Sequence, residues 1–318
     1  MTKLTRRTLI AAAGCALATP ALAQPRTTRL ILPHATGSGV DTITRAAEPA
    51  LARALGQSIV VDNQPGAGGI IGLQALVRAP ADGHTLGVVS NNVVILPSVM
   101  RAFPFAMPDD FTPIAVIGYT PIVLVVNARV PAANARELVA LLTQRRGEMN
   151  YASGGNGTIL HLATEIFLDA TGTRARHIPY RGVGPMLTDL IGGQVEFATA
   201  ALPSVQQHLQ TGALRAIGVA TAQRLAASPG IPTFVEQGVS FQAEAWFAVI
   251  GPKGLPPAEV QRVHAAVVAA FADPAVKEAM ARQGNVIDVQ PAERAMPFFR
   301  SETARFAALV RKVGVEPQ

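Results

Sequence analysis

Short apolar segments alternate with amphipathic segments along most of this chain. A first strand is predicted at Thr28–Leu32, and apolar residues spaced three or four apart predict a helix over Asp41–Leu55. Strands predicted at Ser58–Asp62 and His84–Ser90, with a helix over Ile70–Arg78 between them, continue the alternation. This exchange of strand and helix is typical of α/β proteins, in which ligands bind at the carboxyl ends of parallel strands.

The middle of the chain has the features of a passage between two domains. Two apolar runs within Pro113–Asn127 are interrupted by Gly118–Pro121, and we interpret this segment as the crossing into a second domain. A return is expected between Val219 and Thr233. The expected division is residues 24–120 with 222–318 in one domain and residues 121–221 in the other. Further elements are predicted as a helix over Ala135–Arg145 capped by Asn134 and Glu137, a strand, turn and helix within Asn150–Asp169, strands at Arg176–Pro179, Val195–Ala200 and Leu214–Ala220, helices near Gly184–Ile191 and Ser204–Gln210, and a helical C-terminal part with starts near Ala258, Asp273-Pro274 and Pro291.

Residues 1–23 have the composition of an export signal. A twin arginine, Arg6-Arg7, precedes an alanine-rich apolar run, and Ala21-Leu22-Ala23 is typical of a cleavage site. We expect cleavage after Ala23 and a periplasmic location, by either the twin-arginine or the general export route. The single cysteine, Cys15, lies in this leader, so the mature chain would have no disulfide and no thiolate for catalysis or metal binding.

Charge and motif content exclude several classes of function. The formal net charge is +6, part of it in the leader, and no basic run interleaved with aromatic residues indicates nucleic-acid binding. The histidine spacing does not match a metal site, and no G-x-S-x-G motif occurs. The stretch Gly66–Gly72 is close to a dinucleotide fingerprint, but it follows the polar loop Asp62–Pro65 and no ribose-binding acid is evident. We therefore expect no cofactor, no metal and no enzymatic activity.

Two glycine-rich turns carry the candidate binding chemistry. One lies within Leu32–Asp41 and the other within Tyr151–His161, and each stands between a predicted strand and a predicted helix. The first amides of a helix have no intrahelical acceptor, and the helix dipole favours negative charge there. We therefore expect both turns to offer free N–H groups to an anion. Their wide separation in the sequence suggests two domains that close on one ligand.

The order of motifs along the chain resembles that of the tripartite tricarboxylate transporter receptors, also called Bug receptors. The resemblance spans nearly the whole mature chain. Its motifs are Pro33…Gly37…Asp41, Leu55-Gly56-Gln57, Val61-Asp62-Asn63-Gln64-Pro65-Gly66-Ala67-Gly68-Gly69, Ala81-Asp82-Gly83-His84-Thr85-Leu86, Tyr151-Ala-Ser-Gly-Gly-Asn-Gly-Thr158 with His161, Pro179-Tyr180-Arg181-Gly182, Asp189-Leu-Ile-Gly-Gly-Gln-Val195, and Trp246 with Gly251-Pro252.

This resemblance implies a two-domain periplasmic-binding-protein type II fold, with mostly parallel sheets flanked by helices and a ligand cleft between the domains. It further implies that a small carboxylate is held there and delivered to membrane permease subunits, without any reaction. We expect a monomer. Two alternatives stay open: a ligand-sensing subunit for a signalling partner, and an exported enzyme that uses the glycine turns for a phosphorylated substrate.

In the first turn the resemblance implies ligand contacts from Ala35–Gly39, with two departures. The family usually has an aromatic residue where His34 lies and a second glycine where Ser38 lies, so His34 could place a cation beside an anion. Asp41 is either the helix N-cap or an acceptor for a ligand proton. The candidate ligand-binding residues of this turn are His34, Thr36, Gly37, Ser38, Gly39 and Asp41.

The remaining candidates come from four later segments. In the second turn, backbone amides with the Ser153 and Thr158 side chains are expected around a carboxylate, although Thr158 could be only an N-cap and His161 only a structural histidine. Arg181 could pair with a distal carboxylate or lie exposed, and Trp246 is expected to pack near the hinge. The candidates are Ser153, Gly154, Gly155, Thr158 and His161 of the second turn, Tyr180, Arg181 and Gly182 of a cleft loop, Ser90 and Asn91 (followed by Asn92) at a strand end, and Thr199 and Ala200, whose small size suggests room for ligand.

Overall fold

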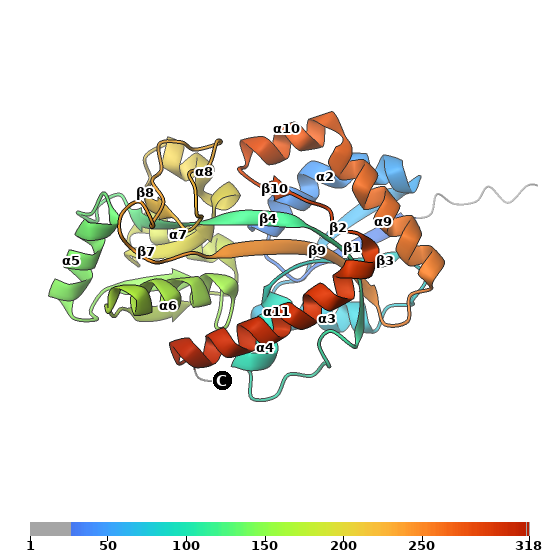
Figure 1. Ribbon diagram of the computed structural model, residues 1–318, viewed down its shortest axis with the longest axis horizontal. Helices are drawn as coiled ribbons and strands as arrows, with labels where there is room; N and C mark the ends of the chain where they lie inside the picture. Colours follow the sequence, from blue (N-terminus) through green and yellow to red (C-terminus); the bar gives the residue numbers. More distant parts are fainter. Residues whose placement is uncertain (1–26, 316, 318) are drawn as a thin grey trace, which may run out of the picture.

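Two lobes lie side by side in the protein, joined by two long strands (Figure 1). The computed structural model describes residues 27–315 and 317, so the predicted leader, its cleavage after Ala23 and Cys15 lie outside the described residues. Strand β4 (Phe111–Asn127) runs through both lobes, and strand β9 (Glu244–Pro252) pairs beside it from the boundary between the lobes into the first lobe. Helix α11 (Ala292–Val313) packs against β4 and against helices of both lobes.

The first lobe is built on the sheet order β2-β1-β3-β9-β4. Its parallel strands alternate with helices, as the hydrophobic pattern predicts. The elements of this lobe are β1 (Thr27–Leu32), α2 (Gly39–Leu55), β2 (Ser58–Asn63), the short 3-10 helix η2 (Ala67–Gly69), α3 (Ile70–Val77), β3 (Thr85–Ser90), α4 (Asn92–Val99), α9 (Pro257–Ala272), α10 (Pro274–Arg282) and β10 (Val286–Ile287).

The second lobe continues the sheet as β4-β7-β5-β6, with β8 also paired to β4. Its first helix is capped as predicted, because Asn134 Oδ1 accepts the Glu137 amide at 3.0 Å. The elements are α5 (Ala135–Arg145), β5 (Asn150–Ser153), α6 (Ile159–Thr171), β6 (Arg176–Pro179), α7 (Val183–Gly192), β7 (Phe197–Ala201), α8 (Leu202–Gln210) and β8 (Leu214–Val219).

Strand β4 is one continuous strand of 17 residues, whereas the sequence indicated two runs separated by Gly118–Pro121. The interruption disappears because β9 pairs with this stretch, from Gly118 opposite Phe247 to Pro121 opposite Glu244. Gly118 is required for another reason: a Cβ there would lie 2.1 Å from the Val286 carbonyl oxygen of β10. Tertiary pairing therefore decides the local structure here.

The α/β class is confirmed, with a refinement of the strand directions. The expectation of mostly parallel sheets holds for β1, β2 and β3 and for β5, β6 and β7, which pair in parallel. It does not hold for the crossing strands, because β4 pairs antiparallel with β7, β8, β9 and β10, and β9 pairs antiparallel with β3. Strand β4, which passes from one lobe to the other, therefore has antiparallel partners in both lobes.

The chain stays with the second lobe for longer than the sequence indicated. Thr233 forms a bridge with Val219 of β8, and Phe234 lies with its ring centroid 5.4 Å from that of Phe167 in α6. Gln237 Oε1 accepts the Ala135 amide at the start of α5 at 2.7 Å. The strand that returns to the first lobe is therefore β9, which starts after the predicted interval of Val219–Thr233.

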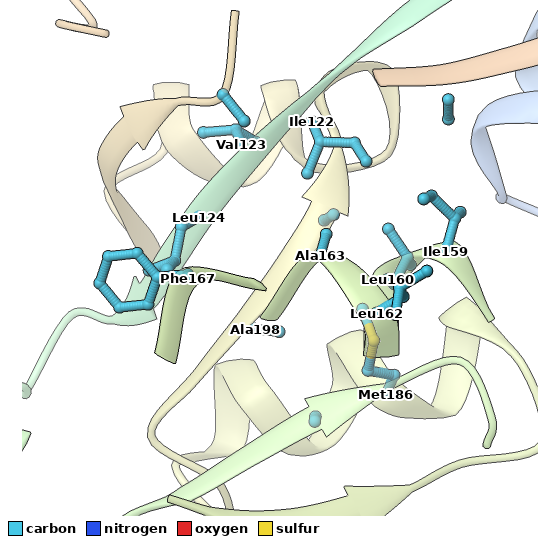
Figure 2. Packing of buried hydrophobic residues seen from close by; sticks show 14 of the residues in the cluster. Ile122, Val123, Leu124, Ile159, Leu160, Leu162, Ala163, Phe167, Met186 and Ala198 are labelled. Atoms are coloured by element: carbon cyan, nitrogen blue, oxygen red, sulfur yellow. The ribbon is translucent and has the colours of Figure 1, made fainter. Parts of the chain in front are cut away.

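Side chains of β4 and α6 belong to one buried cluster in the core of the second lobe (Figure 2). Ile122, Val123 and Leu124 of β4 are fully buried, as are Ala163 and Phe167 of α6. Burial of each large side chain contributes about 1.5–3 kcal/mol.

Within the described residues, no helix combines the length and the apolar character that crossing a membrane requires.

Candidate functional site

A cavity of about 400 Å³ lies between the two lobes. Its wall comes from both lobes and from the crossing strands, where Thr120 of β4 and Ala245 of β9 pair with each other. The predicted site residues that border the cavity are His34, Ser38, Gly39, Ser90, Gly154, Gly155, Thr158, Tyr180, Arg181 and Gly182. Those that do not border it are Thr36, Gly37, Asp41, Asn91, Ser153, His161, Thr199 and Ala200.

Helices α2, α4, α6, α7 and α8 all begin at the wall of this cavity. The residues that place these starts there are Ser38–Val40 for α2, Asn92 for α4, Thr158–Leu160 for α6, Gly182-Val183 for α7, and Ala201 with Ser204 for α8. Each helix N-terminus carries a partial charge of roughly +0.5 from its aligned peptide dipoles. The cavity is therefore electropositive although most of its wall is uncharged, which favours an anion.

In the first lobe the turn before α2 is fixed by Ser38 and Asp41. Ser38 is the N-cap, since its Oγ accepts the Asp41 amide at 3.3 Å, so of the two roles left open for Asp41 the N-cap is wrong. Asp41 Oδ2 instead accepts the Gly37 amide at 2.9 Å. Its Oδ1 accepts Arg45 Nε at 2.9 Å and Asn63 Nδ2 at 3.0 Å. The buried Asp41 carboxylate thus organises the turn from behind and does not face the cavity.

His34 borders the cavity as an uncharged ring. Burial lowers its pKa to about 4, with the nearby Asp41 carboxylate acting weakly in the other direction. The imidazole is therefore neutral at pH 7 and does not supply the cation that the sequence left possible. Its Nε2 is buried and has no hydrogen-bond partner among the described residues. Thr36 and Gly37, the next candidates along the chain, lie exposed outside the cavity.

In the second lobe most amides of the glycine turn are already paired, contrary to the prediction of free N–H groups. The Gly157 amide donates to His161 Nδ1 at 3.1 Å and the Thr158 amide to the Gly155 carbonyl at 3.3 Å. Thr158 is the N-cap of α6, because its Oγ1 accepts the His161 amide at 3.4 Å. Within the described residues, the Leu160 amide at the start of α6 forms no hydrogen bond and remains available.

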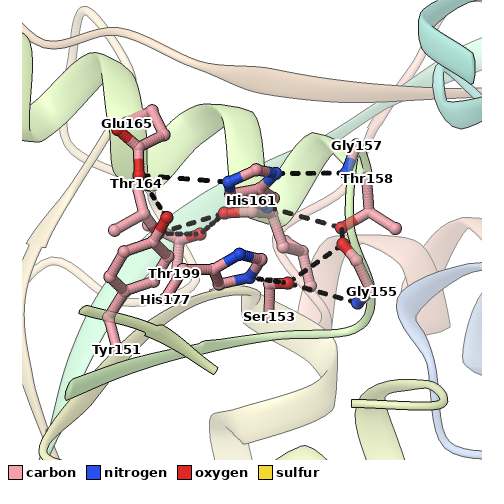
Figure 3. Close-up of polar contacts among 11 residues, drawn as sticks. Tyr151, Ser153, Gly155, Gly157, Thr158, His161, Thr164, Glu165, His177 and Thr199 are labelled. Atoms are coloured by element: carbon pink, nitrogen blue, oxygen red, sulfur yellow. Dashed lines mark hydrogen bonds and ion pairs between the residues drawn. The ribbon is translucent and has the colours of Figure 1, made fainter. Parts of the chain in front are cut away.

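A buried polar cluster supports this turn from behind (Figure 3). Ser153 Oγ bonds to His177 Nε2 at 2.7 Å and accepts the Gly155 amide at 3.2 Å, so this hydroxyl serves the turn and not the cavity. The His177 ring stacks on His161, with centroids 3.9 Å apart, and on Tyr151 at 4.8 Å. His161 is therefore a structural residue, the alternative that the sequence left open.

Burial shifts the pKa of each titratable group of this cluster in the direction that favours its neutral form. Desolvation lowers the pKa of His161 to about 4 and that of His177 to about 3, the latter assisted by His161. Burial also raises the pKa of Glu165, whose carboxylate accepts the Tyr151 hydroxyl, and the pKa of that hydroxyl is raised as well. A packed and hydrogen-bonded cluster of this kind fixes the turn Gly154–Thr158 in one conformation.

The two lobes touch directly around the cavity through glycines. A Cβ on Gly157 would lie 2.0 Å from Val99 Cγ2 of α4, and a Cβ on Gly39 would lie 2.8 Å from Ala201 Cβ. A Cβ on Gly182 would similarly approach Ala35 Cβ at 2.6 Å. Glycine at these positions permits an approach of the lobes that any larger residue would obstruct.

The sequence matches the model of a known family over most of its length. The tripartite tricarboxylate transporter family receptor model covers residues 43–315. The chain belongs to this receptor family. Protein BugT of Bordetella pertussis (strain Tohama I) is 34% identical over 319 residues, which cover 97% of this chain and 98% of BugT. The resemblance inferred from the motifs is thereby confirmed.

Solved structures agree with this assignment. The periplasmic binding protein BugD superposes with a TM-score of 0.88 at 27% identity, covering 92% of this chain and 99% of BugD. The R. palustris protein Rpa4515, solved with adipate, superposes with a TM-score of 0.88 at 29% identity, covering 92% of this chain and 99% of Rpa4515. The expected fold type is confirmed by these likenesses.

In this receptor Asn92, and not Asn91, borders the cavity. Asn91 is fully buried and donates from Nδ2 to the Glu244 carbonyl at 3.1 Å. Asn92 is the first residue of α4, and its Oδ1 accepts the Ile159 amide of α6 at 2.8 Å. The sequence signal was the polar run Ser90–Asn92. Which of these side chains border the cavity is decided by the three-dimensional structure, because Ser90 and Asn92 border it and Asn91 does not.

The remaining candidate residues also differ from the prediction in their position relative to the cavity. Tyr180 donates its hydroxyl to Asp189 Oδ2 at 2.7 Å, and Arg181 lies exposed at the cavity edge. Thr199 is buried and donates to the Leu160 carbonyl at 2.7 Å, so Ala201, two residues on, borders the cavity instead. The loop Pro65–Gly69, which overlaps the weak dinucleotide fingerprint at Gly66–Gly72, also borders the cavity.

Proposed function

We propose that this receptor captures a small carboxylate between its two lobes and delivers it to the membrane permease subunits of a tripartite tricarboxylate-type transporter. The observation that carries this proposal is the start of five helices at one cavity wall. Their dipoles favour an anion, and the amides of Gly39, Val40 and Leu160, which donate to no acceptor in the described part of the chain, provide directed donors.

Size and chemistry support a small organic acid as the ligand. The cavity of about 400 Å³ is at the lower end of the range for small-molecule sites, roughly 300–1,000 Å³. Apolar side chains of Leu96, Val99 and Met100 line one wall and suit a short carbon chain. Rpa4515, which shares this fold, was solved with adipate, and we extend binding of that chemical class to this chain.

Capture involves closure of two domains. The first comprises residues 24–120 and 222–318, and the second comprises residues 121–221. Residues 222–243 lead back to the first domain and pack on the second. The hinge lies in the crossing strands, where β4 changes partner from β9 at Pro121 to β7 at Ile122. A ligand held by amides of both lobes binds the closed form more strongly than the open form and shifts the population toward it. The permease would then recognise the closed form.

The proposed place of action is the periplasm. BugD, which superposes along nearly its whole length, is a periplasmic binding protein. The leader over residues 1–23, with cleavage after Ala23, supports export of this chain to the same compartment. We propose that the mature receptor begins at Gln24 and acts as a monomer.

Thermal-shift screening of the mature protein tests the proposal. The screen contains adipate, malate, hexanoate and aromatic acids, each paired with the corresponding amide, together with nucleotides and sugar phosphates. Binding to the native state alone raises the thermal midpoint, so a rise of several degrees with an acid and none with its amide supports a carboxylate receptor. A rise confined to nucleotides or phosphates contradicts it.

A further inference from the structure

Asn92 forms a hydrogen bond that joins the two lobes across the cavity. Its Oδ1 accepts the backbone N–H of Ile159 at 2.8 Å, so a side chain at the start of α4 in the first lobe holds the first amide of α6 in the second. Asn92 is only 8% exposed. An amide at a helix N-terminus has no intrahelical acceptor, so Asn92 supplies the partner that the helix itself lacks.

This bond depends on close approach of the lobes. Beside it, Gly157 lies so near to Val99 of α4 that even a methyl group would not fit. Gly68 of the first lobe also lies beside the second lobe, because a Cβ there would be in van der Waals contact, at 3.8 Å, with the Asn156 carbonyl oxygen. When the lobes separate, the α4–α6 contact opens, and the Ile159 amide must exchange its acceptor from Asn92 to water.

The nitrogen of the Asn92 carboxamide, Nδ2, is free to donate a hydrogen bond within the described part of the chain. The Ile159 N–H requires an acceptor, which fixes the oxygen toward α6 and leaves the Nδ2 hydrogens on the other side. In the described part of the chain Nδ2 has no hydrogen-bond partner, and Asn92 borders the cavity. An amide N–H₂ group donates well to a carboxylate oxygen.

We infer that Asn92 couples ligand capture to closure: its oxygen holds the Ile159 amide of the opposite lobe, and its nitrogen donates to the bound carboxylate. A ligand that orients the carboxamide through Nδ2 also presents Oδ1 to α6, so binding and closure favour each other. This inference rests on the proposed function for its ligand half, whereas the bond between the lobes stands without a ligand.

The closure half is tested on unliganded mature protein by amide hydrogen exchange of Ile159, resolved by NMR. Asn92→Ala is expected to speed this exchange by about tenfold or more, because the amide loses its acceptor. Asn92→Asp keeps an acceptor and is expected to stay within about threefold of wild type. The Leu162 amide, bonded to the Thr158 carbonyl at 3.0 Å within α6, is the internal reference for intact folding. Unchanged Ile159 exchange in Asn92→Ala, with the reference intact, overturns this half.

The ligand half is tested by titration calorimetry with adipate, malate and hexanoate as probes. Asn92→Asp keeps the bond to Ile159 but replaces the donor by a negative charge, so affinity is expected to fall by about tenfold or more. The matched control is Gln206→Glu, the same change at a second contact between the lobes, where Nε2 donates to the Arg282 carbonyl at 2.7 Å away from the cavity. It is expected to bind within about twofold of wild type.

The outcomes separate the two proposals. Wild-type affinity in Asn92→Asp overturns the ligand half and leaves the receptor function intact. An equal loss in Gln206→Glu also overturns it, because the effect would then follow from charge at any contact between the lobes. Failure of wild-type protein to bind any probe overturns the proposed function and the ligand half with it, while the exchange of Ile159 still decides the closure half.

Discussion

The imidazole rings of His161 and His177 lie parallel, with centroids 3.9 Å apart and an angle of 8° between their planes. One ring belongs to α6 and the other to β6, so the pair joins the helix that starts at the cavity to the sheet behind it. Two imidazolium ions could not stack in this way, since their charges would repel within a buried environment. The pair therefore ties the shape of the ligand turn to the neutral state of both histidines.

The stability of the receptor should depend on pH through this pair. The folded pKa values, about 4 for His161 and about 3 for His177, lie below the ordinary value of 6.5. The unfolded chain therefore binds more protons below pH 6.5, and the free energy of unfolding should fall as the pH drops from 6.5 toward 4. The raised pKa of Glu165 gives the opposite slope above its ordinary value of 4.5 and reduces the net effect. Thermal midpoints measured between pH 4 and pH 7.5 check this expectation.

A variant pair assigns the slope to the cluster. His161→Gln with His177→Gln removes both titrating groups of the cluster and should reduce the pH dependence to the part that the buried His34 contributes, whereas His208→Gln, outside the cluster, should leave it as in wild type. An unchanged slope in the double variant would show that other groups cause the acid sensitivity.

The Tyr151 hydroxyl should contribute more to the free energy of unfolding than the Tyr180 hydroxyl. Tyr151 is fully buried and donates to the half-buried Glu165 carboxylate, so Tyr151→Phe removes this hydrogen bond and should lower the free energy of unfolding by about 1–3 kcal/mol. Tyr180 makes the corresponding bond to Asp189 in a more open position, so Tyr180→Phe should cost under about 1 kcal/mol. Urea denaturation of both variants measures the difference, and equal costs would contradict it.

Gly157 should be required for closure. A Cβ there would lie 2.0 Å from Val99 Cγ2, so Gly157→Ala should hold the lobes apart and weaken binding of an identified carboxylate by about tenfold or more. The control is Gly212→Ala, because Gly212 has a similar positive φ, 72° against 69°, but no atom within 4 Å of a Cβ. Both variants should lose similar backbone stability, and only Gly157→Ala should lose affinity. Calorimetry with small-angle scattering decides between these results.

Removal of the Asp41 side chain should loosen the first ligand turn. The carboxylate accepts from Gly37, Arg45 and Asn63, so Asp41→Ala leaves these donors unpaired and should lower the free energy of unfolding by about 2–4 kcal/mol. Affinity for a carboxylate should fall as well, although Asp41 does not border the cavity. Glu137→Ala, which removes a carboxylate from the exposed cap of α5, should lower the free energy of unfolding less than Asp41→Ala and leave affinity unchanged. A loss of affinity in the control would argue for a global effect.

Local pattern predicted most elements because their causes are local. The α2 and α6 helices follow from apolar spacing, and the capping of α5 by Asn134 follows from side chains within one turn. The long strand β4 was split in the prediction because Gly118 and Pro121 are usual strand breakers, and only the pairing with β9 and β10 overrides them.

The candidate site shows the same division. The position of both turns was predictable, since a glycine-rich loop before a helix start is a local feature. Which groups face the cavity was not predictable, because this depends on contacts between distant residues. Asp41 forms a hydrogen bond with Asn63, Ser153 with His177, and Asn92 with Ile159. Each of these partners is at least 22 residues away in sequence.

The sequence by itself thus determined the family, the alternation of elements and the positions of the two glycine-rich turns, because these depend on residue type and on spacing within a turn or a strand. The tertiary structure alone decided that His34 is neutral, that the amides of the second turn are mostly paired, and that Asn92 spans the lobes. The physical reason is that burial, and the hydrogen-bond partners that burial demands, exist only once the lobes have packed together.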